Sequence, residues 1–303
     1  MQIRKVAPIL AMATFAAAGA FAQAPPFYPP GQLNQLVAPI ALYPDPLLAQ
    51  VLAAATYPDQ IPDAARWADE HHYLTGPDLA NAIQADQLPW DPSVQALLPF
   101  PTVLDTMAGD MNWTTRLGDA FLTQQQDVMN AVQRERRKAR DFGYLRSNGQ
   151  IVVSGGPYIT IVPARPAFVV VPYYDPAVVY VAPRPGFAIA GAIRLGFGVT
   201  VGAVFRPWGW GYNRVDWGTH VVVINNAPWR RTWTNRRVYV HPYTEIRRVT
   251  VVRPAEHHDL HEISKTERAD WREGRKVEEH KEKDRGKHRG EDRGRGRGRG
   301  HDR

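Results

Sequence analysis

Proline is the residue that most constrains what this chain can fold into, because 26 prolines are spread through its 303 residues. Proline has no N–H to give to a helix or a sheet, so it is tolerated at helix starts and at strand ends. Asp45-Pro46 and Asp91-Pro92 place a capping residue directly before a proline, which predicts a helix start at each. The chain must therefore be built from short elements.

Residues 33–145 predict a domain of several helices, preceded by a proline-rich, extended lead-in at residues 23–32. Apolar residues recur there at the helical spacing of three and four positions. Tyr43-Pro44-Asp45 returns as Tyr57-Pro58-Asp59, so we interpret Asp45 and Asp59 as N-caps of two helices. Thr75, with Asp78 three residues later, resembles a capping box.

The longest helix is expected to begin near Asn112, because its apolar residues keep a period close to 3.6 as far as Val132. Its last turns are rich in arginine, which interacts favourably with the negative end of the helix dipole. Gly143 is the predicted C-cap.

After Gly149 the pattern changes to short β-branched and aromatic runs bounded by glycine or proline. Residues 146–185 therefore predict a small β segment, with strands at 151–153, 158–162, 168–171 and 178–181. Residues 186–255 form a glycine- and aromatic-rich region with further short strands at 221–224, 238–240 and 249–252, and Asn225-Asn226 is expected to turn the first of these. The class is α+β.

Residues 186–205 are apolar, rich in glycine and long enough to span a bilayer. Arg194 near the middle of this stretch would be costly in a membrane, which favours a glycine-interrupted hairpin or a buried loop. From residue 256 to 303 charged residues, histidine and glycine dominate and end in an Arg-Gly alternation. Such a tail is expected to be disordered, because it lacks the apolar surface needed to order itself.

Residues 1–22 have the pattern of a cleaved signal peptide. Arg4 and Lys5 precede a short apolar run, and Ala20-Phe21-Ala22 supplies the small residues of a cleavage site. An uncleaved anchor is the alternative, but the run is short and rich in alanine. We therefore expect an exported protein of the periplasm or cell envelope, and the absence of cysteine excludes a lipoprotein.

The absence of cysteine also excludes disulfides, thiolate metal sites and a cysteine nucleophile. The net charge of +7 would suit nucleic acid, but export argues against that partner. The basic excess fits an anionic polymer, contacted through the Arg-Gly tail, or an anionic membrane surface instead.

Two segments, residues 33–58 and 170–181, carry a resemblance to a known family. The first contains Leu42-Tyr43-Pro44-Asp45-Pro46-Leu47-Leu48 and the second contains Val171-Pro172-Tyr173-Tyr174-Asp175-Pro176. Together they resemble a large family of exported proteins of diderm bacteria that is classed as a domain of unknown function. The resemblance implies an envelope location and a helical domain ending in a short β segment, and it implies no activity, cofactor or catalytic residue.

The residues that could carry chemistry do not form a recognisable catalytic or metal motif. Asp45 and Asp59 could be paired acids, but helix capping explains them better. His71-His72 lacks a second ligand pair and fits a solvated helix end. Ser154-Gly155-Gly156 fits a turn rather than a nucleophile elbow. We therefore predict no catalytic residues, no metal site and no cofactor.

A set of aromatic residues beside glycine and proline is the candidate interface, and ordinary packing of a small β module is the alternative explanation of the same residues. Its members are Tyr173, Tyr174, Trp208, Trp210 and Trp217. The sequence thus favours a non-catalytic envelope protein, a scaffold or binding module that contacts the membrane, peptidoglycan or another envelope protein. The alternative is an enzyme acting on cell-wall or surface polysaccharide.

Overall fold

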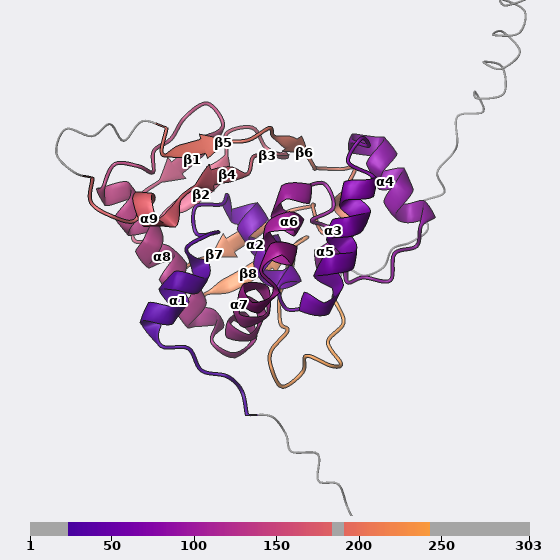
Figure 1. The fold of residues 1–303 in the computed structure, drawn as a ribbon, viewed down its shortest axis with the longest axis horizontal. Coiled ribbons are helices and arrows are strands. Elements are labelled where there is room, and N and C mark those ends of the chain that lie inside the picture. Colours follow the sequence, from indigo (N-terminus) through magenta and orange to yellow (C-terminus); the bar gives the residue numbers. More distant parts are fainter. Residues whose placement is uncertain (1–23, 184–190, 243–303) are drawn as a thin grey trace, which may run out of the picture. The chain divides into compact units, whose positions relative to one another are not determined.

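The computed structural model describes residues 24–183 and 191–242. The predicted signal peptide, the strand candidate at 249–252 and the charged tail lie outside these residues. The first half is helical and the second half consists of short antiparallel strands, which confirms the α+β class (Figure 1). The helices before the first strand are α1 (Pro30–Val37), α2 (Asp45–Ala54), α3 (Ile61–Glu70), α4 (Gly76–Ala85), α5 (Pro92–Gln95), α6 (Pro101–Gly109), α7 (Met111–Thr123) and α8 (Gln125–Asp141).

Prolines do lie in the first turn of helices α1 to α6, as expected, but the capping predictions are only partly right. Asp91 accepts a hydrogen bond from the Ser93 N–H and caps α5. The N-cap of α2 is Pro44, so the prediction for Asp45 is wrong: Asp45 is the first helical residue and its carboxylate points into the core. Asp59 lies in a 3₁₀ turn, Pro58–Gln60, and does not cap α3. Thr75 is at the N-cap position of α4 without a side-chain bond to it.

The predicted long helix is two helices, because the chain breaks at Gln124, which has φ −137° and ψ 46°. The Gln124 side chain accepts a hydrogen bond from the Tyr28 N–H (2.7 Å) and donates one to the Tyr28 carbonyl (3.2 Å). This pairing with a distant backbone segment could not be read from helical periodicity. The end of α8 agrees with the prediction, since Gly143 follows it with φ +81°.

The β segment begins with a hairpin of β1 (Ile151–Ser154) and β2 (Thr160–Pro163). β3 (Phe168–Val169) and β4 (Pro172–Tyr174) then pair with β6 (Val199–Thr200) and β5 (Ile193–Leu195), respectively. Because the two registers differ by one residue, they make one antiparallel ribbon with a bulge between the two ladders. The predicted strand at 178–181 is wrong: Asp175 caps a helical turn, α9 (Pro176–Val179), by accepting from the Ala177 N–H.

In the described part of the apolar stretch 186–205, β5 pairs with β4 and β6 pairs with β3. These strands therefore do not form a hairpin with each other. Among the described residues, no helix has both the length and the hydropathy to cross a membrane. The last sheet contains β7 (Arg214–Asp216), β8 (Val221–Ile224) and β9 (Ala227–Pro228). Asn225 and Asn226 turn β8 into β9 with positive φ angles, as predicted, whereas no strand forms at 238–240.

One core runs across the predicted boundaries at 145 and 185. Buried residues of α1 to α8 pack in the same cluster as Val169, Phe205, Trp208, Trp217 and Trp229. A smaller cluster joins Leu42 and Ala139 to β1, β2 and α9. The described residues of the glycine- and aromatic-rich region are therefore part of the folded body that contains the helices.

The centre of this body is a buried ion pair between Asp45 of α2 and Arg136 of α8, with 2.6 Å between Oδ1 and Nη1. Arg136 has no exposed surface. It also donates to the carbonyls of Ala41, Tyr43 and Ile159, at 2.8 to 2.9 Å. Trp217 donates its indole N–H to the other Asp45 oxygen, and its ring lies 4.8 Å from the guanidinium carbon. A buried charge needs such complete pairing to be tolerated.

A second polar contact fastens the last described segment, residues 229–242, to the helices. Asp91 pairs with His241 at 3.0 Å and accepts from the Ser93 N–H and hydroxyl. Arg231 donates to the carbonyl and hydroxyl of Thr56, directly after α2. The second Tyr-Pro-Asp segment is therefore covered by chain from the far end of the folded body.

We predict that Asp45→Asn destabilises the fold by about 3–5 kcal/mol, because it leaves the buried Arg136 charge without its counterion. Urea unfolding followed by tryptophan fluorescence measures the change. Asp63→Asn is the matched control, since its ion pair with Arg66 is exposed and should contribute at most about 1 kcal/mol. Equal effects of the two substitutions would contradict the role assigned to Asp45.

A pH prediction follows from Asp91. Burial alone would raise the pKa of its carboxyl, but the hydrogen bonds and charge of His241 and the bonds from Ser93 outweigh burial and lower the pKa. A depressed folded-state pKa adds stability above the unfolded-state value of about 3.9, and this stability is lost as the pH falls through the folded-state value. Urea titrations from pH 6 to 3 should therefore show a shallower acid decline of unfolding free energy in Asp91→Asn than in the native chain. Parallel declines would refute this assignment.

Candidate functional site

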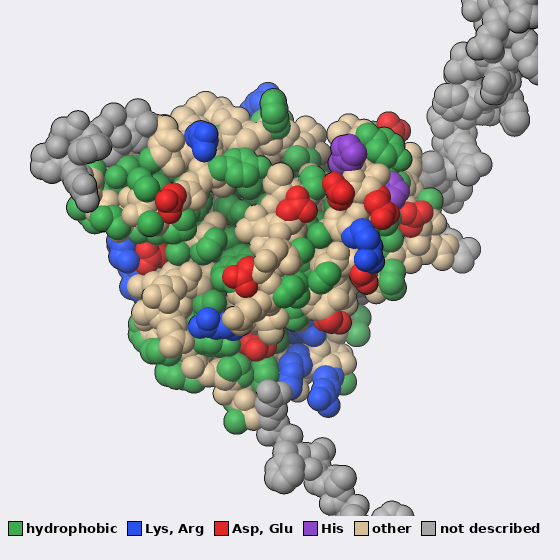
Figure 2. All heavy atoms as spheres, in the orientation of Figure 1, with side chains coloured by type: hydrophobic (Ala, Val, Ile, Leu, Met, Phe, Trp, Pro, Cys, Tyr) green, Lys and Arg blue, Asp and Glu red, His purple; other side chains and the backbone are tan. Residues whose placement is uncertain are grey.

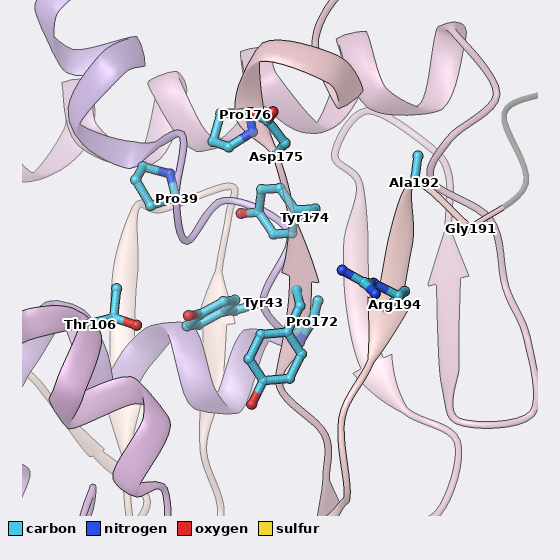
Figure 3. Close-up of a pocket in the computed structure, with 11 residues that line it drawn as sticks. Pro39, Tyr43, Thr106, Pro172, Tyr174, Asp175, Pro176, Gly191, Ala192 and Arg194 are labelled. Atoms are coloured by element: carbon cyan, nitrogen blue, oxygen red, sulfur yellow. The ribbon is translucent and has the colours of Figure 1, made fainter. Parts of the chain in front are cut away.

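The two segments that carry the family resemblance meet at a groove of about 620 Å³ (Figure 3). One wall comes from the loop before α2 and from α6, and the other comes from β4, β5 and the start of α9. The lining residues are Pro39, Tyr43, Thr106, Pro172, Tyr173, Tyr174, Asp175, Pro176, Gly191, Ala192 and Arg194. Segments more than a hundred residues apart thus build one concave surface.

Tyr43 forms the floor on the helical side, and its position depends on the buried ion pair. The Tyr43 carbonyl accepts a hydrogen bond from Arg136. Two residues later, Asp45 begins α2 and supplies the acid of the ion pair. Burial, with a smaller contribution from Tyr173, raises the pKa of the Tyr43 hydroxyl well above its ordinary value. The hydroxyl therefore stays protonated and remains a hydrogen-bond donor. Figure 3 shows it directed toward Thr106 of α6.

Tyr174 joins the two walls. Its hydroxyl donates to the Ala38 carbonyl (2.9 Å) and accepts from the Leu42 N–H (3.2 Å). Tyr180 donates to the same carbonyl at 3.0 Å. Burial raises the pKa of Tyr174 far above its ordinary value, so this clamp does not titrate near neutral pH. The loop at residues 38–42 is thereby fixed against β4.

Tyr173 is the groove's accessible ring, with 44% of its surface exposed. Its hydroxyl donates to Thr102 Oγ1 (3.1 Å), and its ring lies over Gly196. A Cβ at Gly196 would lie 2.5 Å from the ring, and one at Gly198 would lie 2.2 Å from the ring of Phe168. The two glycines of the ribbon are therefore needed for the aromatic rings to lie flat against it.

Among the described residues that line the groove, the charged side chains are one acid and one base. The acid is Asp175, and one of its carboxylate oxygens accepts a hydrogen bond from the Ala177 N–H and so caps α9. Arg194 lies opposite Tyr173 in the β4–β5 register, and Figure 3 shows its guanidinium reaching toward β4. The remaining lining is proline, tyrosine and small residues. This is the composition of a site that binds through apolar contact and a few oriented polar groups.

The carboxyl groups near the groove bear on the polysaccharide-enzyme alternative. The residues known to line the groove include one carboxylate and no histidine or serine, whereas polysaccharide hydrolysis commonly uses two carboxyl groups. Asp45, proposed as one member of an acid pair, is buried against Arg136 and only 4% exposed.

Asp91, His241 and Ser93 form another polar cluster of catalytic residue types. Ser93 donates its hydroxyl to Asp91 Oδ1 (2.6 Å), and His241 pairs with the same carboxylate. In a hydrolytic triad the histidine lies between the serine and the acid. Here the acid lies between them and Ser93 is fully buried, so the cluster is arranged to fasten chain segments together.

The described residues contain no group of three or more histidine, cysteine or acidic side chains close enough to hold a metal ion. His71 and His72 lie just after α3, where each Nδ1 contacts a carbonyl of that helix. The structure thus places them at a helix end, as the sequence indicated.

The five aromatic residues of the predicted interface do not lie on a common surface. Trp208, Trp210 and Trp217 are each less than 5% exposed, and their rings pack in the core. Trp210 donates its indole N–H to the Ala96 carbonyl, and Trp217 donates its indole N–H to the Asp45 carboxylate. Tyr174 is the clamp, which leaves Tyr173 as the exposed member of the set.

The sequence reasoning missed Tyr43, Thr106 and Arg194 as groove residues. Tyr43 was recognisable only as part of the repeated Tyr-Pro-Asp motif.

Figure 2 shows the molecule in the same orientation as Figure 1. Acidic and histidine side chains gather over α3 and α4, whereas hydrophobic side chains are prominent on the side of the β ribbons. The side formed by the β ribbons, which supply one wall of the groove, is thus the less charged one in this view.

Comparison with known proteins identifies a family whose function is unknown. No solved structure matches the chain. The Escherichia coli (strain K12) protein "Uncharacterized protein YacH" is 38% identical over an alignment of 182 residues, and the match covers 49% of this chain and 29% of the relative. The chain thus spans less than a third of that relative's length. The family described as "Protein of unknown function (DUF3300)" matches residues 29–267, more than three quarters of the sequence, and the chain belongs to this family.

Proposed function

We propose that this protein is a non-catalytic binding module of the cell envelope, in which the groove between the two signature segments is the ligand site. The observation that carries the proposal is the groove itself, in which tyrosine and proline walls surround a single acid and a single base. Its floor and clamp are held by hydrogen bonds from Arg136 and Tyr174. A preformed site of this kind loses little entropy when it binds.

The envelope location rests on residues 1–22, whose basic, apolar and small-residue regions follow the order of a signal peptide. Export would bring the groove to the periplasm, where the membrane surface, peptidoglycan and other envelope proteins are available as partners. The basic tail would add unspecific attraction to anionic polymers there. Nucleic acid is not a partner in this proposal.

The first test is crosslinking in cells from a photoreactive phenylalanine placed at Tyr173, at the accessible wall of the groove. Position 73 is the matched control, because Tyr73 is also exposed (70%) and does not line the groove. We expect a discrete adduct from position 173 and none from position 73. Fractionation of the same cells should find the protein with membranes or peptidoglycan. A chain found only in the soluble extract, without an adduct at 173, would contradict the proposal.

A second prediction separates the groove from the rest of the surface. Gly196→Ala forces the Tyr173 ring away from its place, whereas Gly149→Ala meets no atom within 4 Å. We expect Gly196→Ala to lower retention in the membrane or wall fraction at least fivefold, while Gly149→Ala leaves retention unchanged. Thermal unfolding of both variants provides the folding control. If both variants are retained like the native chain, the groove is not the ligand site.

The polysaccharide enzyme remains the competing function. It predicts turnover of wall or surface polysaccharide that disappears in Asp175→Asn, the groove carboxylate, without loss of thermal stability. Such a result would replace the binding proposal.

A further inference from the structure

We propose that the groove receives the start of the proline-rich lead-in, residues 24–27, of a second copy of this chain. The inference rests on the proposed function, because it names the ligand of that same groove. Three observations carry it: the conformation and exposure of the lead-in, the lining of the groove, and the place where the lead-in leaves the fold.

In the segment before α1, Ala24, Pro25 and Phe27 are exposed and Pro26 is half-buried, whereas Tyr28 is buried in its own fold. The rings of Pro25 and Pro26 fix φ at about −65°, which favours polyproline II, and Pro29 directly before α1 has that conformation with φ −66° and ψ 158°. Phe27 exposes 75% of its surface, so its ring is free to pack against a partner. A polyproline II segment is already ordered and its carbonyls have no internal donors, so it loses little entropy on docking and presents acceptors.

The groove matches that segment in chemistry. Proline-rich segments dock into grooves lined by aromatic side chains, where rings and prolines pack against one another. Here Pro39, Pro172 and Tyr173 supply such walls. Tyr43 keeps its hydroxyl proton and can donate to a peptide carbonyl. A volume of about 620 Å³ suits a ligand of a few residues.

The lead-in leaves its own molecule in a direction away from that molecule's groove. Tyr28 is fixed to Gln124, at the junction of α7 and α8, by two hydrogen bonds. The four described residues before it span at most about 14 Å. In Figure 1 this indigo segment runs from α1 away from the β ribbons that form the groove wall. The groove of another molecule is therefore its natural acceptor.

Because the donor segment and the acceptor groove are different surfaces, the contact is heterologous. Each molecule would donate one lead-in and accept another, which builds rings or open chains. The contact can therefore be divided between two variants, one without a functional donor and one without a functional acceptor.

Sedimentation velocity of the mature chain over a range of concentrations tests the proposal. We expect reversible association that weakens at least tenfold in Phe27→Ala, the donor variant, and in Tyr173→Ala, the acceptor variant. Tyr73→Ala is the matched control, because its exposed ring lies outside the groove, and it should associate like the native chain. Mixing the donor and acceptor variants should restore one contact and give a one-to-one heterodimer. A native chain that stays monomeric, or a mixture that does not associate, would overturn the proposal.

A peptide experiment distinguishes failure of this inference from failure of the proposed function. The probe is a fluorescent peptide of residues 23–31, titrated into the Phe27→Ala chain, whose groove is intact. We expect saturable binding that is lost when Tyr173→Ala is added, and binding at least tenfold weaker for a peptide with its prolines replaced by alanine. No binding overturns the second-copy proposal, and the crosslink from position 173 then decides the proposed function separately. Peptide binding without association of whole chains also overturns it, and indicates a proline-rich segment of another protein.

Discussion

The fold depends on one buried cation, the guanidinium of Arg136. Taking such a charge out of water costs several kcal/mol, so each of its hydrogen-bonding directions must be satisfied by a group in a defined position. Asp45 supplies the opposite charge, and the carbonyls of Ala41, Tyr43 and Ile159 supply the other acceptors. These acceptors come from the loop before α2 and the strand segment after α8. A single side chain therefore fixes helices and strands relative to each other.

The groove is a consequence of that arrangement. The carbonyl of Tyr43 is held by Arg136, and the carbonyl of Ala38 by Tyr174 and Tyr180. With both ends of this loop fixed, the Tyr43 ring becomes a floor and β4 becomes the opposite wall. The ribbon completes the wall because Gly196 leaves room for the Tyr173 ring. The residues that look like a helix-capping motif in the sequence thus build a binding surface.

Local patterns predicted the elements that local chemistry determines. The class, the Asp91 cap, the glycine after α8 and the Asn225-Asn226 turn all follow from nearby residues. The errors occur where a distant group competes: Asp45 faces Arg136 instead of capping, and Gln124 breaks a helix to bind Tyr28. The sequence left open whether the three core tryptophans form an interface or pack in a small β module, because the helices and the glycine-rich region were treated as separate parts. The groove could not be predicted, because its walls lie about 130 residues apart in sequence and no periodicity joins them.

Hydrogen exchange in Arg136→Lys tests the central claim most directly, because lysine keeps the charge but lacks the planar fork that reaches four acceptors. The account predicts that exchange accelerates by more than tenfold at the amides of Leu42 and Ile161, whose hydrogen bonds go to Tyr174 and Asp45. Amides of α3, which is remote from the guanidinium contacts, should keep their protection. Unchanged exchange at Leu42 and Ile161, or uniform acceleration throughout the fold, would contradict the claim that Arg136 holds the groove-forming segments together.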